Sequence, residues 1–196
     1  MSNVTAAQIL IGIRKKYPKL AVLREVTIPD PFELAIYHKW KSQTGSRYYL
    51  DWAKKNNIPL AESVPEGWNP VQAKLERRID ALIFTTKSRT AVEIKVTRAD
   101  FKRDVFEKRR AWMHYTHKFV YATPKGLVTK EEIPEGCGWW EYDPNLAGPG
   151  YWESGIVVSK RAVSRVAEEL PPALITSLMG RLSRYEYLSE RSKGND

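Results

Sequence analysis

The sequence has almost no cysteine and no long apolar run, and each absence excludes classes of protein. Cys137 is the only cysteine in 196 residues, which rules out an internal disulfide framework and a cysteine-based zinc site. No apolar stretch approaches the roughly 18 residues that a membrane span needs. Near the N-terminus the basic residues follow the apolar stretch, whereas a secretory signal has them before it. We therefore expect a cytoplasmic protein with no membrane partner.

Acidic residues are absent from the first 24 positions, which hold five basic residues. Residues 87–125 carry 11 basic and 4 acidic residues, whereas residues 126–159 carry 1 and 6. The net charge of +9 is therefore concentrated in two segments. This distribution is typical of a surface that meets a polyanion such as nucleic acid. A solvated basic face without a partner would have the same composition, so charge alone does not decide between the two.

Hydrophobic periodicity and turn residues predict a mixed α/β sheet flanked by helices. The first element is a helix at 4–17, which Thr5 and Gln8 open as a capping box. It is followed by a strand at 20–28 that contains Glu25 and stops at a proline pair. The later elements are a hairpin of strands at 76–85 and 90–96, a charged helix at 98–115, a buried strand at 118–123, a short strand at 137–142 and mostly helical structure at 160–189.

Residues 32–70 form an aromatic-rich insertion, within which a helix at 47–57 is opened by Ser46. We expect one α/β domain over 1–159 that contains this insertion, and a helical extension over 160–196 that packs on the domain or trails from it. The insertion has two interpretations: a small secondary core, which we favour, or a surface on which nucleic-acid bases stack. The residues concerned are Tyr37, His38, Lys39, Trp40, Lys41, Arg47, Tyr48, Tyr49 and Trp52.

Charged residues interrupt the two β-rich runs of the hairpin. Alternate residues of a strand share a face, so Glu93 and Lys95 project together while Val92 and Ile94 face the other way. A short hairpin brings Asp80 beside Glu93. Two carboxylates and a lysine then converge on one face of an otherwise apolar sheet. Carboxylate oxygens are the ligands that Mg²⁺ prefers. A surface salt bridge on a half-exposed strand is the alternative.

An aspartate in one strand and Glu-x-Lys in the next is similar to the PD-(D/E)XK nuclease superfamily. The run ValGluIleLysValThrArgAlaAspPheLysArgAsp at 92–104 resembles the MmcB-like DNA-repair branch and its phage relatives. The likeness continues through HisLysPheValTyrAlaThrPro at 117–124 and IleProGluGlyCysGlyTrpTrp at 133–140. It covers roughly residues 76–143. The chain departs from RecB-like exonucleases, which carry Gln-x-x-x-Tyr where this sequence has LysArgArgAlaTrp at 108–112.

The resemblance implies a restriction-endonuclease-like core and a metal-dependent nuclease that hydrolyses DNA in repair, recombination or phage DNA metabolism. It implies that Asp80 and Glu93 bind Mg²⁺, with Mn²⁺ as a possible substitute, and that Lys95 is the catalytic lysine. Glu25 holds the early acidic position of this fold and would be an auxiliary metal ligand. The substrate would be DNA, single- or double-stranded.

Basic residues crowd the predicted helix after the site. The spacing of Asp104 and Lys108 fits an i,i+4 pair, so part of this charge is expected to stabilise the helix. Arg98, Lys102 and Arg109 are the expected phosphate contacts, with affinity that depends on salt. Two other functions use the same fold and surface. One is a non-catalytic nucleic-acid-binding module, and the other is a helper subunit whose aromatic insertion is a protein interface.

Overall fold

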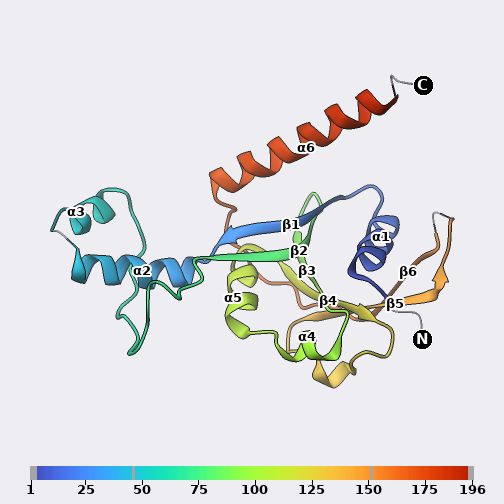
Figure 1. Ribbon diagram of the computed structural model, residues 1–196, viewed down its shortest axis with the longest axis horizontal. Coiled ribbons are helices and arrows are strands. Elements are labelled where there is room, and N and C mark those ends of the chain that lie inside the picture. The colour runs from blue at the N-terminus through green and yellow to red at the C-terminus, as the bar shows by residue number, and fades with distance from the viewer. Residues whose placement is uncertain (1–3, 46, 151, 194–196) are drawn as a thin grey trace.

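The computed structural model describes residues 4–45, 47–150 and 152–193. At its centre is a six-stranded sheet whose strands lie side by side in chain order (Figure 1). The third to fifth strands are parallel, and the other neighbouring pairs are antiparallel. The predicted mixed sheet flanked by helices is therefore confirmed. The strands are β1 (Ala21–Pro29), β2 (Glu76–Phe84), β3 (Arg89–Ile94), β4 (Lys118–Pro124), β5 (Gly138–Ala147) and β6 (Ser154–Lys160).

One face of the sheet is covered by α1 (Ala6–Lys16). Thr5 caps this helix through the capping box that the sequence predicts. Ile13 is completely buried against the strands. Gly12 lies where α1 crosses β6, and a Cβ at this position would overlap the carbonyl oxygen of Ser154. The helix therefore needs glycine here to approach the sheet so closely.

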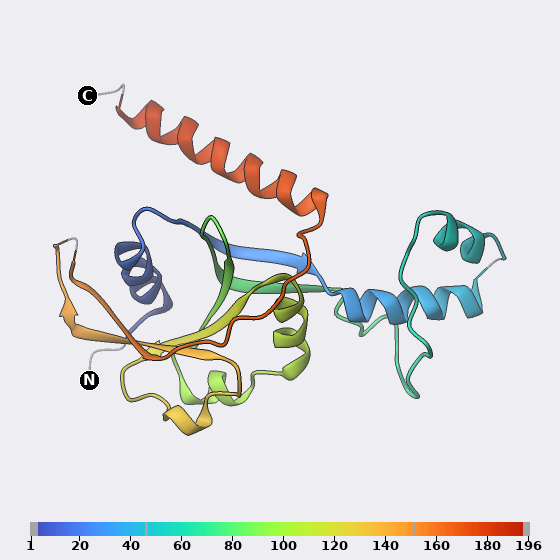
Figure 2. The ribbon, with the colours of Figure 1, turned by 180° about the vertical axis from the view of Figure 1, so that it is seen from behind.

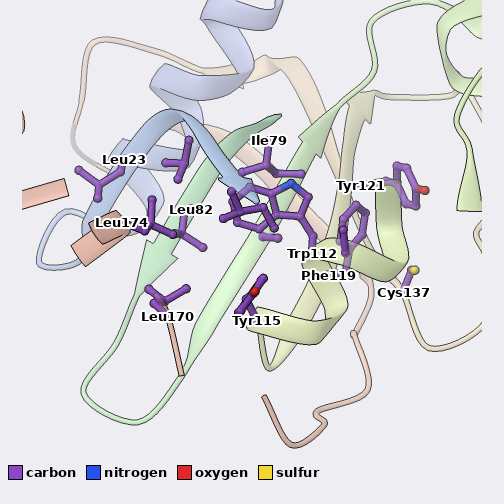
Figure 3. Close-up of a cluster of buried hydrophobic side chains, with 14 of the residues drawn as sticks. Leu23, Ile79, Leu82, Trp112, Tyr115, Phe119, Tyr121, Cys137, Leu170 and Leu174 are labelled. Atoms are coloured by element: carbon purple, nitrogen blue, oxygen red, sulfur yellow. The ribbon is translucent and has the colours of Figure 1, made fainter. Parts of the chain in front are cut away.

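The opposite face is covered by α5 (Phe106–Tyr115) and the first turns of α6 (Pro172–Lys193). Trp112 of α5 is completely buried and lies among side chains of the strands, with Phe119 beside it (Figure 3). Leu174 of α6 packs into the same cluster. Glu93 and Lys95 project toward this face, as the strand alternation predicts, because Val92 and Ile94 belong to the cluster under α1.

The expected continuous helix at 98–115 is wrong: two helices, α4 (Arg98–Lys102) and α5, are separated by a break. Val105 has extended backbone (φ −112°, ψ 143°) and a side chain 45% exposed, so it does not lie on the apolar side of a helix. The break turns Asp104 toward Lys95, which follows β3, and toward Arg109 of α5. These ion pairs across the fold outweigh the local helical pattern.

The insertion contains two helices, α2 (Pro31–Thr44) and α3 (Arg47–Lys55). The predicted helix at 47–57 corresponds to α3, while Ser46 lies outside the described residues. The sequence interpretation missed α2. Asp30 is its N-cap and accepts hydrogen bonds from the next two free backbone N–H groups, with proline at the first helical position. Both helices project from one side of the sheet in both views (Figures 1 and 2).

The C-terminal segment differs from the prediction in two ways. The sequence interpretation missed β6, and residues 161–171 are not helical although helix was expected from 160. This stretch is held in place by backbone hydrogen bonds instead, such as those from Arg165 to His117 and from Glu168 to His114. The helical extension begins only at Pro172. Neither α6 nor any other helix within the described ranges is long and apolar enough to cross a membrane.

Candidate active site

Asp80 and Glu93 face each other across the β2–β3 hairpin. The register pairs Ala81 with Val92, so the next residues along the two strands are Asp80 and Glu93. Oδ2 of Asp80 accepts a hydrogen bond of 2.7 Å from the backbone N–H of Ile94. This bond fixes the carboxylate at the point where the strand pairing ends. The hairpin therefore brings the two predicted carboxylates together.

Lys95 follows β3 and is buried beside Glu93. Its Nζ lies 3.0 Å from Oε1 of Glu93, and both side chains are more than nine-tenths buried. Two further carboxylates surround the ammonium group, with Asp104 at 3.5 Å and Asp100 at 3.6 Å. Burial acts to lower the pKa of Lys95, but attraction to these carboxylates outweighs it and the pKa is raised. Lys95 is therefore a firmly held cation in this arrangement.

A second lysine, Lys108 of α5, donates a hydrogen bond of 2.5 Å to the same Oε1 of Glu93. The predicted pair of Asp104 with Lys108 does not form, because Asp104 binds Arg109 at 2.7 Å instead. The helix break causes this change: Asp104 lies before the first turn of α5, where its carboxylate reaches inward. Lys108 is thus a site residue that the sequence interpretation assigned to helix stabilisation.

One of the two carboxylate oxygens of Glu93 lacks a hydrogen-bond partner within the described part of the chain. Its Oε2 is buried and has no hydrogen-bond partner among the residues that the structure describes. Burial first, and repulsion from Asp80 second, raise the pKa of Glu93, while Lys108 and Lys95 oppose this shift. A buried acceptor without a partner costs about 1–3 kcal/mol. An added cation between Glu93 and Asp80 would remove that cost.

Tyr121 of β4 and Arg109 of α5 complete the site behind Asp104. The Tyr121 hydroxyl donates to Oδ2 of Asp104, and the guanidinium group of Arg109 lies 3.2 Å from the hydroxyl oxygen. Burial, with the hydrogen bond to Asp104, raises the pKa of Tyr121 strongly. These three side chains line a cavity of about 330 Å³, whose rim includes Lys102 and Glu132. Asp104, which pairs with Lys95, belongs to the lining of this cavity.

The three predicted phosphate contacts differ in their surroundings. Arg98 forms an ion pair of 2.5 Å with Glu132, and Arg109 is paired with Asp104. Lys102 is exposed at the rim of the cavity and forms no ion pair within the described part of the chain. Among the described residues, Lys102 is therefore the one of the three cations that no ion pair neutralises.

Glu25 lies in β1 at a local irregularity. The register passes from Arg24 opposite Ala81 to Val26 opposite Ile79, so Glu25 lies across from Asp80 on the neighbouring strand. Its φ of 49° is in the left-handed region, and its side chain is exposed. In the described residues no group of three or more His, Cys, Asp or Glu side chains is placed to hold a metal ion. The expected role of Glu25 as a third ligand stays a prediction.

The sequence interpretation missed four residues of this cluster. Three of them, Asp100, Asp104 and Lys108, are spaced four residues apart directly after Glu-x-Lys, and this spacing was the available signal. It was interpreted as one helical face, which the break at 103–105 removes. Tyr121 gave no signal, because a tyrosine in a buried strand looks like any core residue.

Comparison with known proteins adds little to this geometry. No family model matches the chain, and no curated protein matches it significantly. Among solved structures, a protein of unknown function from Silicibacter pomeroyi is similar with a TM-score of 0.40 and 18% sequence identity. The similarity covers 59% of this chain and 69% of that protein.

Proposed function

We propose that the chain is a metal-dependent nuclease of the PD-(D/E)XK type that hydrolyses phosphodiester bonds in DNA. The observation that carries the proposal is the arrangement of the buried Glu93 and Lys95 with the partly buried Asp80 on one face of the sheet, where Oε2 of Glu93 has no partner among the described residues. A surface salt bridge, the alternative to a site, does not account for a glutamate and a lysine that are both more than nine-tenths buried.

Asp80 and Glu93 are the residues that would hold the cation, Mg²⁺ or Mn²⁺. The bound ion would supply positive charge where negative charge accumulates on the phosphate. Lys95 is held by Glu93, Asp104 and Asp100 in a fixed position, from which its ammonium group can donate a hydrogen bond to a phosphate oxygen or to the attacking water. Lys108 occupies Oε1 of Glu93 and must turn away for both oxygens to serve as ligands.

The test is cleavage of plasmid and single-stranded circular DNA with Mg²⁺, with Mn²⁺, and with a chelator. Lys95→Met and Glu93→Gln should each lower the rate by at least roughly 10²-fold, since each removes a group that acts at the transition state. Lys95→Arg should not restore cleavage, because a guanidinium group does not match the compact ammonium group. Cleavage by Lys95→Met at the rate of the unaltered protein would overturn the proposal.

Matched controls separate the site from general charge. Lys87→Met and Glu135→Gln make the same changes at exposed positions outside the site. Both variants should cleave like the unaltered protein. Thermal unfolding of all five variants checks that a loss of cleavage does not come from a loss of folding.

A non-catalytic nucleic-acid-binding module is the second candidate. The observation that favours it is the ion pair of Lys108 with Glu93, because the lysine already occupies an oxygen that would otherwise bind the metal ion. Such a module would bind DNA equally well with Mg²⁺ and with chelator, and it would leave the DNA intact under both conditions.

A further inference from the structure

The insertion carries a continuous row of aromatic rings on a segment that has almost no core. Among the described residues of 31–70, only Ala53 is buried, and α2 buries none of its side chains. The favoured interpretation of these rings as a small core stays a prediction, since most of the rings contact one another but are only partly buried. Neighbouring rings are 5.5–6.3 Å apart from centroid to centroid. In order, the row consists of Trp52, Tyr49, His38, Tyr37, Trp40 and Trp68, which we name the aromatic row.

Positive charge accompanies these rings. Residues 37–55 contain five basic residues and one acidic residue. Nζ of Lys41 lies 5.7 Å from the ring centre of Tyr37 and 6.0 Å from that of Tyr49. Trp52 at the end of the row is 49% exposed, and Tyr48, one helical turn before it, is 85% exposed. The insertion thus combines two exposed rings, Tyr48 and Trp52, with a lysine that lies over two rings of the row.

We infer that the aromatic row binds an unpaired nucleic-acid strand, with bases stacked on the rings and lysines along the backbone. Surfaces that bind single strands combine these two features. A protein interface is disfavoured by the charge, because the centres of such interfaces are depleted in lysine. The inference rests on the proposed function and names its substrate class: DNA with a single-stranded segment.

The insertion contacts α5, the helix that also contributes a lysine to the candidate active site. Phe32 at the start of α2 contacts His114 of α5, with ring centres 5.6 Å apart, and Arg110 of α5 lies over the Phe32 ring at 4.1 Å. The same helix supplies Lys108 to Glu93. Tyr37 is six residues beyond Pro31, or about 9 Å along the axis of α2. The part of the insertion that contacts α5 is thus the start of α2, about 9 Å along the helix from Tyr37.

The test measures binding of fluorescently labelled oligothymidylate by anisotropy, with chelator present so that no cleavage occurs. Trp52→Ala should weaken binding roughly 5- to 150-fold, the range for loss of one stacked base. Trp52→Phe keeps a ring and should stay close to the unaltered protein. Tyr48→Ala, at a still more exposed position, is the second variant and should also weaken binding. Val71→Ala changes a side chain that is 90% exposed directly after the insertion and outside the row, and should have no effect.

The outcomes distinguish this inference from the proposed function. Binding that is unchanged in both Trp52→Ala and Tyr48→Ala would overturn the inference, even in a protein that cleaves DNA. An equal loss of affinity for duplex DNA would overturn it too, because paired bases do not offer their faces. Loss of self-association in sedimentation, with oligothymidylate affinity intact, would identify the row as a protein interface and also overturn it. A protein that binds through the row but never cleaves would contradict the proposed function alone.

Discussion

Glu93 is the residue on which the candidate site depends. It receives two lysines on one oxygen and none on the other, and it faces Asp80 across the hairpin. A buried carboxylate in this position is stabilised by whichever cations reach it. Lys108 is less buried than Lys95, with 25% of its side chain exposed against 8%. The lysine of α5 is therefore the one that can leave when another cation arrives.

Lys108 and a divalent cation would compete for Oε1 of Glu93. Lys108→Met should tighten Mg²⁺ or Mn²⁺ binding by several-fold, because Oε1 of Glu93 is then opposed only by Lys95. Titration calorimetry of the DNA-free protein measures this affinity. Lys102→Met removes the same charge from an exposed position of α4 and should leave it unchanged. Weaker metal binding in Lys108→Met would mean that this lysine supports the site rather than competing for it.

Residue-level patterns predicted part of this site and missed the rest for a physical reason. The alternation of a strand is local, so the shared face of Glu93 and Lys95 could be derived from the sequence. Asp104 reaches Lys95 only because the helix breaks, and the ion pairs that hold the break join Asp104 to Lys95, just after β3, and to Arg109 of α5. No local pattern contains that information, since the helical spacing of 98–115 is intact in the sequence.

At the scale of elements, the attachment of α2 depends on one buried ion pair. Asp30 is completely buried, and its Oδ2 lies 2.8 Å from Nε of Arg77 at the start of β2. The other oxygen caps α2. The sequence interpretation used the prolines around Asp30 only as the end of a strand, although Asp followed by Pro also begins helices. The partner in β2 is 47 residues away and could not be predicted from spacing.

Removal of this carboxylate should therefore be costly. Asp30→Ala leaves Arg77 buried without a partner and should lower the free energy of unfolding by about 3–5 kcal/mol, measured by denaturant titration. The double variant with Arg77→Met should recover part of that loss. Asp51→Ala, an exposed aspartate in α3, should change stability by less than about 0.5 kcal/mol. A similar small effect for Asp30→Ala would show that the pair does not hold the insertion.

At the scale of the whole molecule, the net charge of +9 overstates the charge that is free to meet DNA. Internal ion pairs engage several cations of the most basic segment, including Arg98, Lys108 and Arg109. The basic character predicted from composition is real, but its distribution depends on the fold. Exposed lysines at the edge of the cavity and on the insertion contribute positive charge that stays accessible to DNA.

The salt dependence of DNA binding checks this distinction between paired and unpaired cations. Lys102→Gln should flatten the slope of log affinity against log salt by roughly 0.7–0.9, the value for one phosphate contact. Arg98→Gln should change the slope much less, because Glu132 already neutralises this guanidinium group. Filter binding across a salt series measures both slopes. The reverse ranking would place Arg98 rather than Lys102 on the substrate.

The order of the strands has a consequence for how the chain reaches this fold. Each strand pairs with the next one in the sequence, although β1 and β2 are separated by the 46 residues from 30 to 75. The ends of that segment already meet, since Pro29 pairs with Glu76. Loop-closure entropy rises only slowly with length, so this long connection costs about 2 kcal/mol more than a four-residue turn. Evolution can therefore lengthen or shorten the insertion with little loss of sheet stability, while the rate of folding is more sensitive to its length.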